Sequence, residues 1–386
     1  MPETCFELLG RSFDIQRYPP NDASQLRAWD SADRYLLDQV EQSLADFSKV
    51  IVLHDNFGTL TLVISEIYEV SLMSYGDSWM SREAICSNIQ ANTGQGFDGF
   101  VSTLTLDGLT EFHQDKPVLV VGRVPKAKAE LASLLNMLRQ GLPENSCLLL
   151  AGMDKYLSKG QFDLIAKYFG EAEFLPGWKK ARVWRATIDK TLEVKRHKPL
   201  ATFTVPEFEL TLQSYPNVFS RDSLDIGARF FLEHYSYVPS KLNVVDLACG
   251  SGVLGLAYLK RHPASHMLFT DESYQALAST QLNIDANFDQ GQCVTEVRAD
   301  DALKSARPGS IDLVLCNPPF HQQTTISTDI AYAMFENAKR ALCKGGQLWL
   351  VANRHLGYHQ VLKRLFGNST TVEGNRKFVI LRAVKR

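Results

Sequence analysis

The chain lacks the features that mark membrane, secreted and zinc-binding proteins. No apolar stretch approaches the roughly 20 residues that a helix needs to cross a bilayer. Residues 1–5 lack the basic and apolar regions of a signal peptide. The seven cysteines form no CxxC pair. We therefore expect reduced thiols in the cytoplasm rather than disulfides, and we expect no metal site and no membrane partner.

A strong charge of either sign is also missing. The formal net charge is −2, with 41 Lys and Arg against 43 Asp and Glu. This balance neither indicates nor excludes a nucleic-acid partner, because a local basic face is enough to bind one. At 386 residues, 45% of them hydrophobic, the chain is long enough for two domains that each bury a core.

An internal repeat is the strongest sign of domain organisation. Segments of the first half match segments of the second half in the same order and at a nearly constant offset. The matched pairs are 52–60 with 246–254, 88–92 with 283–287, Pro125 with Pro319, Phe169-Gly170 with Phe366-Gly367, and Arg185-Ala186 with Arg382-Ala383. The repeated unit is far longer than a solenoid repeat, so we interpret the chain as a tandem duplication of one domain.

Each half alternates short apolar runs with helical patterns, which predicts an α/β fold with two doubly wound, mostly parallel sheets. In the second half the patterns predict strands at 243–247, 266–270, 293–298, 311–316, 347–352 and 378–382, helices at 252–261, 274–287 and 330–341, and a turn at 344–346. We expect domains at 1–190 and 207–386. The linker at 191–206 is rich in charge and carries Pro199 and Pro206.

A glycine-containing turn follows the first of these strands. Residues 243–247 end with Asp246 and Leu247 and run into Ala248-Cys249-Gly250-Ser251-Gly252. Glycines at 250 and 252 let the backbone pass close to a ligand at the carboxyl end of the strand, where open α/β sheets bind ligands. The alternative interpretation is a plain turn between a strand and a helix.

Acidic residues follow the next two strands. Asp271 stands at the tip of the second strand, where a carboxylate can hold a ribose diol, and it can also begin the next helix. Asp301, which we prefer to Asp300, can accept from an adenine amino group, or it can belong to a solvated turn. Upstream, Phe219 and Ser220 can line the same pocket as part of a lid, or precede an ordinary capped helix.

The run Asn317-Pro318-Pro319-Phe320 ends the strand at 311–316. An amine conjugated to a ring is a poor nucleophile, because its lone pair is delocalised. The Asn317 side-chain oxygen and the Pro318 carbonyl can accept from its two N–H groups, while Phe320 stacks on the base. The alternative is a Pro-Pro turn followed by a core phenylalanine. The glycine turn, the two acids and this run occur in the order of an S-adenosylmethionine-dependent methyltransferase.

The second half resembles the small-domain N-methyltransferases that carry Asn-Pro-Pro-Phe. The whole chain resembles the duplicated-domain family of bacterial large-subunit (23S) rRNA guanine-N2 methyltransferases. That resemblance runs through Gln16-Arg17-Tyr18-Pro19, Leu26-Arg27-Ala28-Trp29-Asp30, Trp178-Lys179-Lys180-Ala181-Arg182, 217–230, 317–323 and Val351-Ala352-Asn353-Arg354-His355-Leu356.

The resemblance implies a tandem pair of Rossmann-like class I methyltransferase domains whose N-terminal copy is degenerate. It implies methylation of one guanine at N2 in 23S rRNA not yet assembled into the subunit, with no obligate protein partner. Catalysis then falls to Asn317, Pro318, Pro319 and Phe320, and donor binding to Asp246, Ala248, Gly250, Gly252, Asp271, Asp301, Asn317, Phe219 and Ser220. Ala248 departs from the glycine of many members, and alanine should fit there if that position keeps a negative φ.

The first half has lost the donor residues. Val52 stands in the place of Asp246, Asn56 in that of Gly250, and Arg123-Val124-Pro125-Lys126 replaces Asn-Pro-Pro-Phe. We expect this copy to bind RNA instead, through the basic residues Arg123, Lys126, Lys179, Lys180 and Arg182 and through stacking on Trp178 and Trp184. The alternative is a solvated strand face with core tryptophans.

Three other functions remain open at this point. The nearest is guanine-N2 methylation of small-subunit (16S) rRNA by the related family. A protein glutamine methyltransferase is the second, because Asn-Pro-Pro can also hold a primary carboxamide. The third is an RNA-binding protein without turnover, against which the intact Asp246, Asp271 and Asn317 count.

Overall fold

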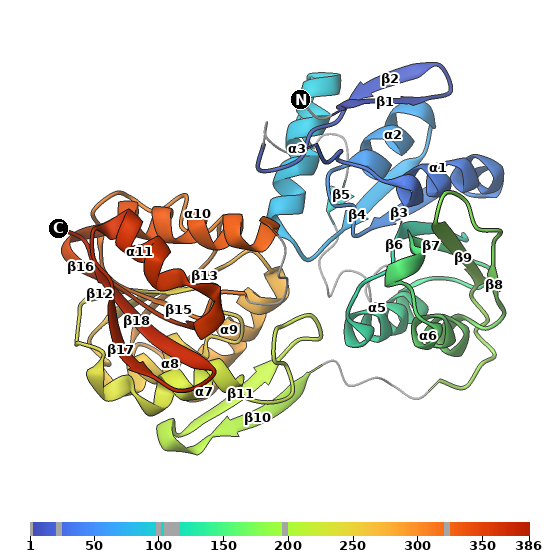
Figure 1. Cartoon of the computed structure of the whole chain (residues 1–386). Coiled ribbons are helices and arrows are strands. Elements are labelled where there is room, and N and C mark those ends of the chain that lie inside the picture. The colour runs from blue at the N-terminus through green and yellow to red at the C-terminus, as the bar shows by residue number, and fades with distance from the viewer. Residues whose placement is uncertain (1–2, 21–24, 98–101, 104–115, 195–199, 320–324) are drawn as a thin grey trace. The chain divides into compact units, whose positions relative to one another are not determined.

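The structure is a computed structural model, and it describes residues 3–20, 25–97, 102–103, 116–194, 200–319 and 325–386. It divides into two compact units, Met1–Pro199 and Leu200–Arg386 (Figure 1). Within the described ranges each unit holds a seven-stranded sheet and a separate two-stranded hairpin. No helix in these ranges is long and apolar enough to cross a membrane.

The first unit begins with its hairpin and continues into alternating helices and strands. Its elements are β1 (Cys5–Leu8), β2 (Arg11–Asp14), α1 (Ser31–Ser43), η1 (Leu44–Asp46), β3 (Lys49–Leu53), α2 (Thr59–Ile67), β4 (Ser71–Tyr75), α3 (Trp79–Thr93), β5 (Ser102–Thr103), β6 (Leu119–Arg123), α5 (Lys128–Gly141), β7 (Cys147–Met153), η3 (Asp154–Tyr156), α6 (Lys159–Phe169), β8 (Ala172–Phe174) and β9 (Ala181–Thr187).

The second unit repeats this succession. Its elements are β10 (Ala201–Val205), η4 (Pro206–Phe208), β11 (Leu210–Ser214), α7 (Ile226–Glu233), η5 (Tyr235–Tyr237), β12 (Asn243–Leu247), α8 (Val253–Arg261), β13 (His266–Asp271), α9 (Tyr274–Asn287), β14 (Val294–Ala299), β15 (Ile311–Cys316), α10 (Thr325–Ala341), β16 (Leu342–Asn353), η6 (Arg354–Leu356), α11 (Tyr358–Phe366), β17 (Thr370–Gly374) and β18 (Phe378–Val384).

The two large sheets have the same topology. Their strand orders are β5-β4-β3-β6-β7-β9-β8 and β14-β13-β12-β15-β16-β18-β17. In each sheet the first five strands pair in parallel, and β9 or β18 runs antiparallel to both of its neighbours. The strand order reverses at β12 and β15, so their carboxyl ends flank the topological switch point where open α/β sheets bind ligands.

The sheet cores follow from apolar residues on both faces of each central strand. In β3 the side chains of Val50 and Val52 join one buried cluster, while those of Ile51 and Leu53 join the other. This is the pattern of parallel strands covered by helices on both sides. In β12, Val245 and Leu247 fill one face, and Asp246 replaces an apolar residue on the other.

Two pairs of asparagines give the clearest evidence of duplication. Asn88 on α3 accepts from the backbone N–H of Gln16 and donates to its carbonyl, with N···O distances of 3.0 and 2.9 Å. Asn283 on α9 does the same with Gln213, at 2.7 and 2.9 Å. Asn92 and Asn287 bind Asp14 and Thr211 in the same way. Each pair ties the end of a hairpin to the helix after the second strand of its sheet.

The structure corrects two predictions made from the sequence. Residues 201–205 of the expected linker form β10, which pairs with β11 and buries Val205, Leu210 and Leu212 in the core of the second unit. The expected turn at 344–346 lies inside β16, where the pairing with β15 shifts register between Ile311 and Leu313. Both errors come from taking Pro206 and paired glycines as signs of chain outside strands.

Candidate active site

The loop after β12 uses the left-handed region of backbone space three times. Ala248 has φ +57°, Gly250 +57° and Gly252 +79°. A Cβ atom at Gly252 would lie 3.0 Å from Cγ2 of Thr280, whereas one at Gly250 would meet no atom within 4 Å. Gly252 therefore allows close packing against α9, and Gly250 leaves its surroundings open to a ligand.

Ala248 does not meet the condition of a negative φ under which alanine should fit. Its φ of +57° places an L-residue with a Cβ atom in a conformation that costs roughly 1–2 kcal/mol. His54, the equivalent residue of the first unit, has φ +51°. The left-handed backbone thus belongs to the loop itself, and the alanine is accommodated under strain.

Asp246 anchors the helix that follows the loop. It is 1% exposed, and its Oδ2 accepts from the backbone N–H of Gly255 at 2.8 Å. Burial, with a smaller contribution from the nearby charge of Asp271, raises the pKa of Asp246 to about 8. The geometry assigns Asp246 a direct part in holding α8 against β12. A contact between Asp246 and a methyl donor stays a prediction.

Asp271 joins the tip of β13 to the glycine loop. Its Oδ2 accepts from the N–H of Gly250 and its Oδ1 from the N–H of Ser273, both at 3.0 Å. Burial raises the pKa of Asp271. The helix cap itself is Ser273, which accepts from Ala276. Asp271 therefore lies beside the open position at Gly250, as the prediction of a ribose contact requires.

The two acids after β14 have different surroundings. Both carboxylate oxygens of Asp300, which is 3% exposed, accept from Ser305, including its Oγ at 2.6 Å. Asp301 has Lys304 as its ion-pair partner, with Nζ 3.8 Å from Oδ2, and burial raises its pKa. Asp300 is thus bound within its own turn, and the preference for Asp301 as a ligand residue stays a prediction.

Asn317 lies directly after β15 and contacts the start of α7. Its Nδ2 donates to Oδ2 of Asp225 at 3.2 Å, and Asp225 also caps α7 by accepting from the N–H of Ala228. The Oδ1 atom of Asn317 is buried and has no hydrogen-bond partner among the described residues. A buried acceptor without a partner is rare and costly, and it is the feature expected of a group that binds a donor on a substrate.

The neighbours of Asn317 are only partly described. Pro318 is buried and Pro319 is exposed, while Phe320 lies outside the described residues. In the segment before α7, the ring of Phe219 is 47% exposed. Ser220 has φ +53°, and its Oγ donates to the carbonyl of Ser223 at 2.7 Å. The Ser220 hydroxyl thus holds the turn in which Phe219 lies, and their predicted donor contacts remain untested.

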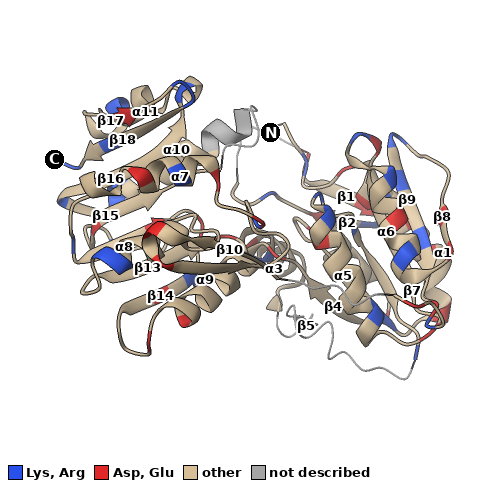
Figure 2. Ribbon diagram, turned by 90° about the horizontal axis from the view of Figure 1, so that it is seen from below, with Lys and Arg blue, Asp and Glu red and all other residues tan. Residues whose placement is uncertain are grey.

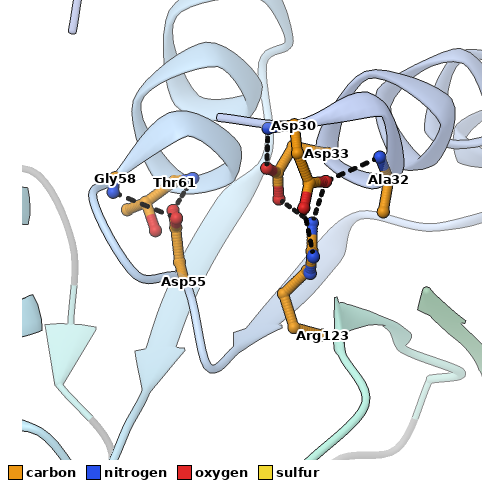
Figure 3. Close-up of polar contacts among 7 residues, drawn as sticks. All are labelled: Asp30, Ala32, Asp33, Asp55, Gly58, Thr61 and Arg123. Atoms are coloured by element: carbon orange, nitrogen blue, oxygen red, sulfur yellow. Dashed lines mark hydrogen bonds and ion pairs between the residues drawn. The ribbon is translucent and has the colours of Figure 1, made fainter. Parts of the chain in front are cut away.

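The position equivalent to Asn317 in the first unit is Arg123, whose contacts lie mainly within the protein. Its guanidinium is 16% exposed and binds both oxygens of Asp30, at 2.6 and 2.8 Å, and Oδ1 of Asp33, at 2.9 Å (Figure 3). Burial alone would lower the pKa of Arg123, but the two carboxylates raise it. The charge of Arg123 is therefore paired within the protein, and its contact with RNA stays a prediction.

In the first unit the loop after β3 is held by the carboxylate of Asp55. Asp55 accepts from the N–H groups of Gly58 and Thr61, at 3.0 and 2.7 Å (Figure 3). Thr61 is the equivalent of Gly255, whose N–H binds Asp246 in the second unit. The carboxylate that holds the following helix thus lies in the strand in the second unit and in the loop in the first. Asn56 and Phe57 stand in the places of Gly250 and Ser251.

Exposed basic residues lie near the carboxyl end of β7. The ring of Tyr156 is 57% exposed, with the Nζ atoms of Lys155 and Lys126 at 4.6 and 5.9 Å from its centroid. The carbonyl of Lys180 accepts from the N–H of Asp154, which brings the exposed Lys179-Lys180 turn beside them. We call Lys126, Lys155, Tyr156, Lys179 and Lys180 the basic rim. Lys155 and Tyr156 were not predicted from the sequence, where their signal is a Lys-Tyr pair one residue after a strand.

Other residues predicted to bind RNA differ in their surroundings. Arg182 is 39% exposed and pairs with Asp154 at 3.0 Å, so part of its charge is neutralised. Trp184 is 2% exposed and packs in the core, which excludes it as a stacking platform. Trp178 is partly buried, with the Nζ of Lys179 4.5 Å from its ring centroid.

A cavity of about 570 Å³ beside Trp178 carries charges of both signs. Its lining includes Arg27 and Lys179 as well as Glu7 and Asp38. Figure 2 shows the same mixture of basic and acidic residues over both units. The basic rim, rather than this cavity, is thus the better candidate for contacts with phosphate. Among the described residues no group of three or more His, Cys, Asp or Glu side chains is placed to hold a metal.

Comparison with known proteins agrees with this division of the chain. The family described as "Methyltransferase small domain" matches residues 209–382, and the family described as "RLMG N-terminal domain" matches residues 3–190. The ribosomal RNA large subunit methyltransferase G of Yersinia enterocolitica is 39% identical over 98% of this chain and 94% of its own length. The protein of the same name from Yersinia pestis is 37% identical over 97% of this chain and 93% of its own.

Among solved structures, the T. thermophilus 16S rRNA N2 methyltransferase RsmC, in complex with AdoMet and guanosine, has a TM-score of 0.75 to this chain. The two are 21% identical, and the match covers 99% of this chain and 98% of that one. The likeness confirms the predicted fold class, a duplicated Rossmann-like α/β domain, over the full length.

Proposed function

This chain belongs to the ribosomal RNA large subunit methyltransferase G family, and from that membership we propose that it methylates the exocyclic N2 of one guanine in 23S rRNA. S-adenosylmethionine is the proposed methyl donor. The observation that carries the proposal is the buried, unpartnered Oδ1 of Asn317, at the carboxyl end of a strand beside the switch point of the sheet. A hydrogen-bond acceptor held there suits the N–H of a nucleobase amine.

The residues at the site suit the transfer of a methyl group to such an amine. When bound, S-adenosylmethionine supplies an electrophilic methyl group on a sulfonium ion. Asn317 Oδ1 and the Pro318 carbonyl accept from the amine and turn its lone pair toward that methyl group. Positioning of this kind supplies most of the acceleration, and the alkylated amine loses its proton without a strong base. Phe320 is proposed to stack on the base.

The donor is proposed to bind across the loops at the carboxyl ends of β12, β13 and β14. Three observations support this placement: the open surroundings of Gly250, the position of Asp271 beside it, and the carboxylate of Asp301. The loop at Ala248 and Gly252 shapes this surface, Asp246 holds it in place, and Phe219 and Ser220 are proposed to cover it.

The first unit is proposed to recognise RNA. The lysines of the basic rim, together with Arg182, contact phosphates, and the exposed ring of Tyr156 stacks on an unpaired base. The substrate is proposed to be 23S rRNA before its assembly with ribosomal proteins, in the cytoplasm. Because phosphate contacts release counterions, the affinity for RNA should fall steeply with salt.

Labelled methyl transfer tests the proposal. The protein is incubated with tritiated S-adenosylmethionine and rRNA from cells that lack the gene, as deproteinised 23S, deproteinised 16S and intact subunits. We expect label in bare 23S RNA, recovered as N2-methylguanosine. Label confined to 16S RNA would reassign the substrate to the small subunit, and label in no RNA would direct the search to protein glutamine.

Charge reversal tests the basic rim. In Lys179→Glu/Lys180→Glu, loss of two phosphate contacts should reduce the slope of log K against log salt by about 1.4 in a filter-binding titration, since each contact contributes about 0.7 for single strands. A variant with the affinity and salt slope of the parent would remove these two lysines from the RNA surface.

A further inference from the structure

We propose that Asp225 is a positioning residue for the methyl transfer, which fixes the Asn317 amide with its oxygen toward the target amine. The inference rests on the proposed function and adds to it a residue that contacts neither base nor donor. Asp225 belongs to the segment that enters α7, and Asn317 follows β15, so the contact joins two distant parts of the second unit.

The chemistry of the two side chains sets the orientation. A carboxylate only accepts hydrogen bonds, whereas a carboxamide has one accepting oxygen and one donating NH₂ group. Asn317 therefore turns its Nδ2 to Oδ2 of Asp225, at 3.2 Å, and its Oδ1 away from that carboxylate. Without Asp225 the amide could rotate by half a turn and present two N–H groups to the amine, which would repel it.

Asp225 is itself held in place. Its Oδ2 accepts from the N–H of Ala228 at 2.9 Å, so the start of α7 holds the oxygen that Asn317 contacts. The Asp225–Asn317 contact also requires that residue 227 be glycine, which has no side chain. A Cβ atom there would lie 2.9 Å from Oδ2 of Asp225 and 3.5 Å from Oδ1 of Asn317. Glycine at this position thus leaves room for both groups.

The duplication shows that the fold pairs these two positions. Asp30 caps α1 as Asp225 caps α7, and Arg123 is the equivalent of Asn317. In the first unit Asp30 and Arg123 bind through two hydrogen bonds, at 2.6 and 2.8 Å. The acidic cap is thus present in both units. Only its partner differs, a cation in the unit without donor residues and an amide in the unit with them.

A carboxylate is also the better partner for electronic reasons. A hydrogen bond from Nδ2 to a negative charge polarises the amide and strengthens Oδ1 as an acceptor. Because the acceptor is already oriented, little reorganisation is needed when the amine loses electron density to the methyl group. The expected consequence of losing Asp225 is a slower chemical step with unchanged binding of the donor.

Two substitutions separate the contact from the helix cap. In Asp225→Ser the hydroxyl still caps α7 but is too short to reach Asn317, and we expect kcat to fall roughly 10- to 100-fold, the scale of one lost active-site hydrogen bond. In Asp225→Asn the side-chain oxygen still serves Ala228 and Asn317, and we expect kcat within about 5-fold of the parent, the loss of charge alone. The KM for RNA and the Kd for donor should change by less than about 2-fold in both variants.

Matched variants report whether the effect passes through Asn317. Asp222→Asn removes a charge from the same segment, at a side chain that is 81% exposed, and should leave kcat unchanged. In an Asn317→Ala background, Asp225→Ser should cause no further loss under single-turnover conditions. Additive losses, a parental kcat for Asp225→Ser, or an equal loss in Asp225→Asn would each overturn the proposal.

A spectroscopic measurement keeps this inference separate from the proposed function. The side-chain NH₂ signals of Asn317, assigned by their loss in Asn317→Ala, should move in Asp225→Ser and stay near their parental shifts in Asp225→Asn. If no RNA is methylated but the signals behave in this way, the proposed substrate fails and the orientation of the amide stands. Signals that do not respond to Asp225→Ser would refute the orientation whatever the substrate.

Discussion

Replacing Arg123 by alanine should destabilise the first unit rather than weaken RNA binding. The guanidinium is 16% exposed, and it neutralises Asp33, whose side chain is 13% exposed, and Asp30, which is 42% exposed. Removing one partner of a buried ion pair costs about 3–5 kcal/mol because a charge stays behind without compensation. Asp30 reaches solvent, which reduces that cost, so we expect a loss of about 2–4 kcal/mol.

The loss of stability in Arg123→Ala should depend on pH, and the surroundings of Asp33 determine whether it grows or shrinks as pH rises. Burial raises the pKa of Asp33 to about 6 even though the charge of Arg123 opposes the shift. Without Arg123 this pKa rises further above its value in the unfolded chain. The folded variant then holds a proton that the unfolded chain has released, so its stability falls as pH rises. The destabilisation by Arg123→Ala should thus be greater at pH 8 than at pH 5.

Urea unfolding followed by circular dichroism measures this effect. With a slope of about 2–3 kcal/mol per molar urea, the midpoint of the affected transition should fall by about 1 M. Arg182→Ala is the matched control, because its ion pair is 39% and 44% exposed and should contribute less than about 1 kcal/mol. An unchanged midpoint in Arg123→Ala, together with weaker RNA binding below the transition, would refute the assignment.

Two further predictions concern the donor loop. In Asp246→Asn the amide oxygen can still accept from the N–H of Gly255, but the carboxyl group whose pKa is raised to about 8 is gone. Because of that raised pKa the parent loses stability from about pH 4 to pH 8, so the variant should be more stable than the parent in urea by a margin that grows over this window. A margin independent of pH would contradict the burial argument. Ala248→Gly removes the backbone strain at φ +57° but raises the conformational entropy of the unfolded chain, so the stability should rise by about 0.5 kcal/mol. A loss of stability above about 1 kcal/mol would show that the alanine makes packing contacts that matter.

The elements that the sequence predicts correctly are those with strong local signals. Helix α9 and strands β12 and β15 have the predicted bounds, since a capping serine begins the first and apolar runs define the others. The hairpin of β10 and β11 was missed because its stability comes from pairing with each other and with α9 through Asn283 and Asn287. Contacts between distant segments leave no local signal of this kind.

The same distinction applies to the site. Asn317 was identified because the chemistry of its motif is local, whereas the partner of Arg123 was not, because Asp30 lies far from it in the chain. The sign of φ at Ala248 could not be predicted for a related reason, since the loop between strand and helix, and not the residue type, determines it. Asp225 was not identified as a site residue from the sequence. Alignment of the two halves places Asp30 opposite Asp225 and could have pointed to the pair.

Single-turnover methyl transfer by Asn317→Ala, with donor affinity measured in parallel by calorimetry, tests the central claim most directly. The claim is that Oδ1 of Asn317, buried and without a partner, holds the target amine in the transition state. We predict a rate on bare 23S rRNA that is about 100-fold or more below the parent, the scale of one lost transition-state contact, with a donor Kd within about 3-fold. A variant that transfers the methyl group at the parental rate, or that loses donor binding in proportion to rate, would contradict the account.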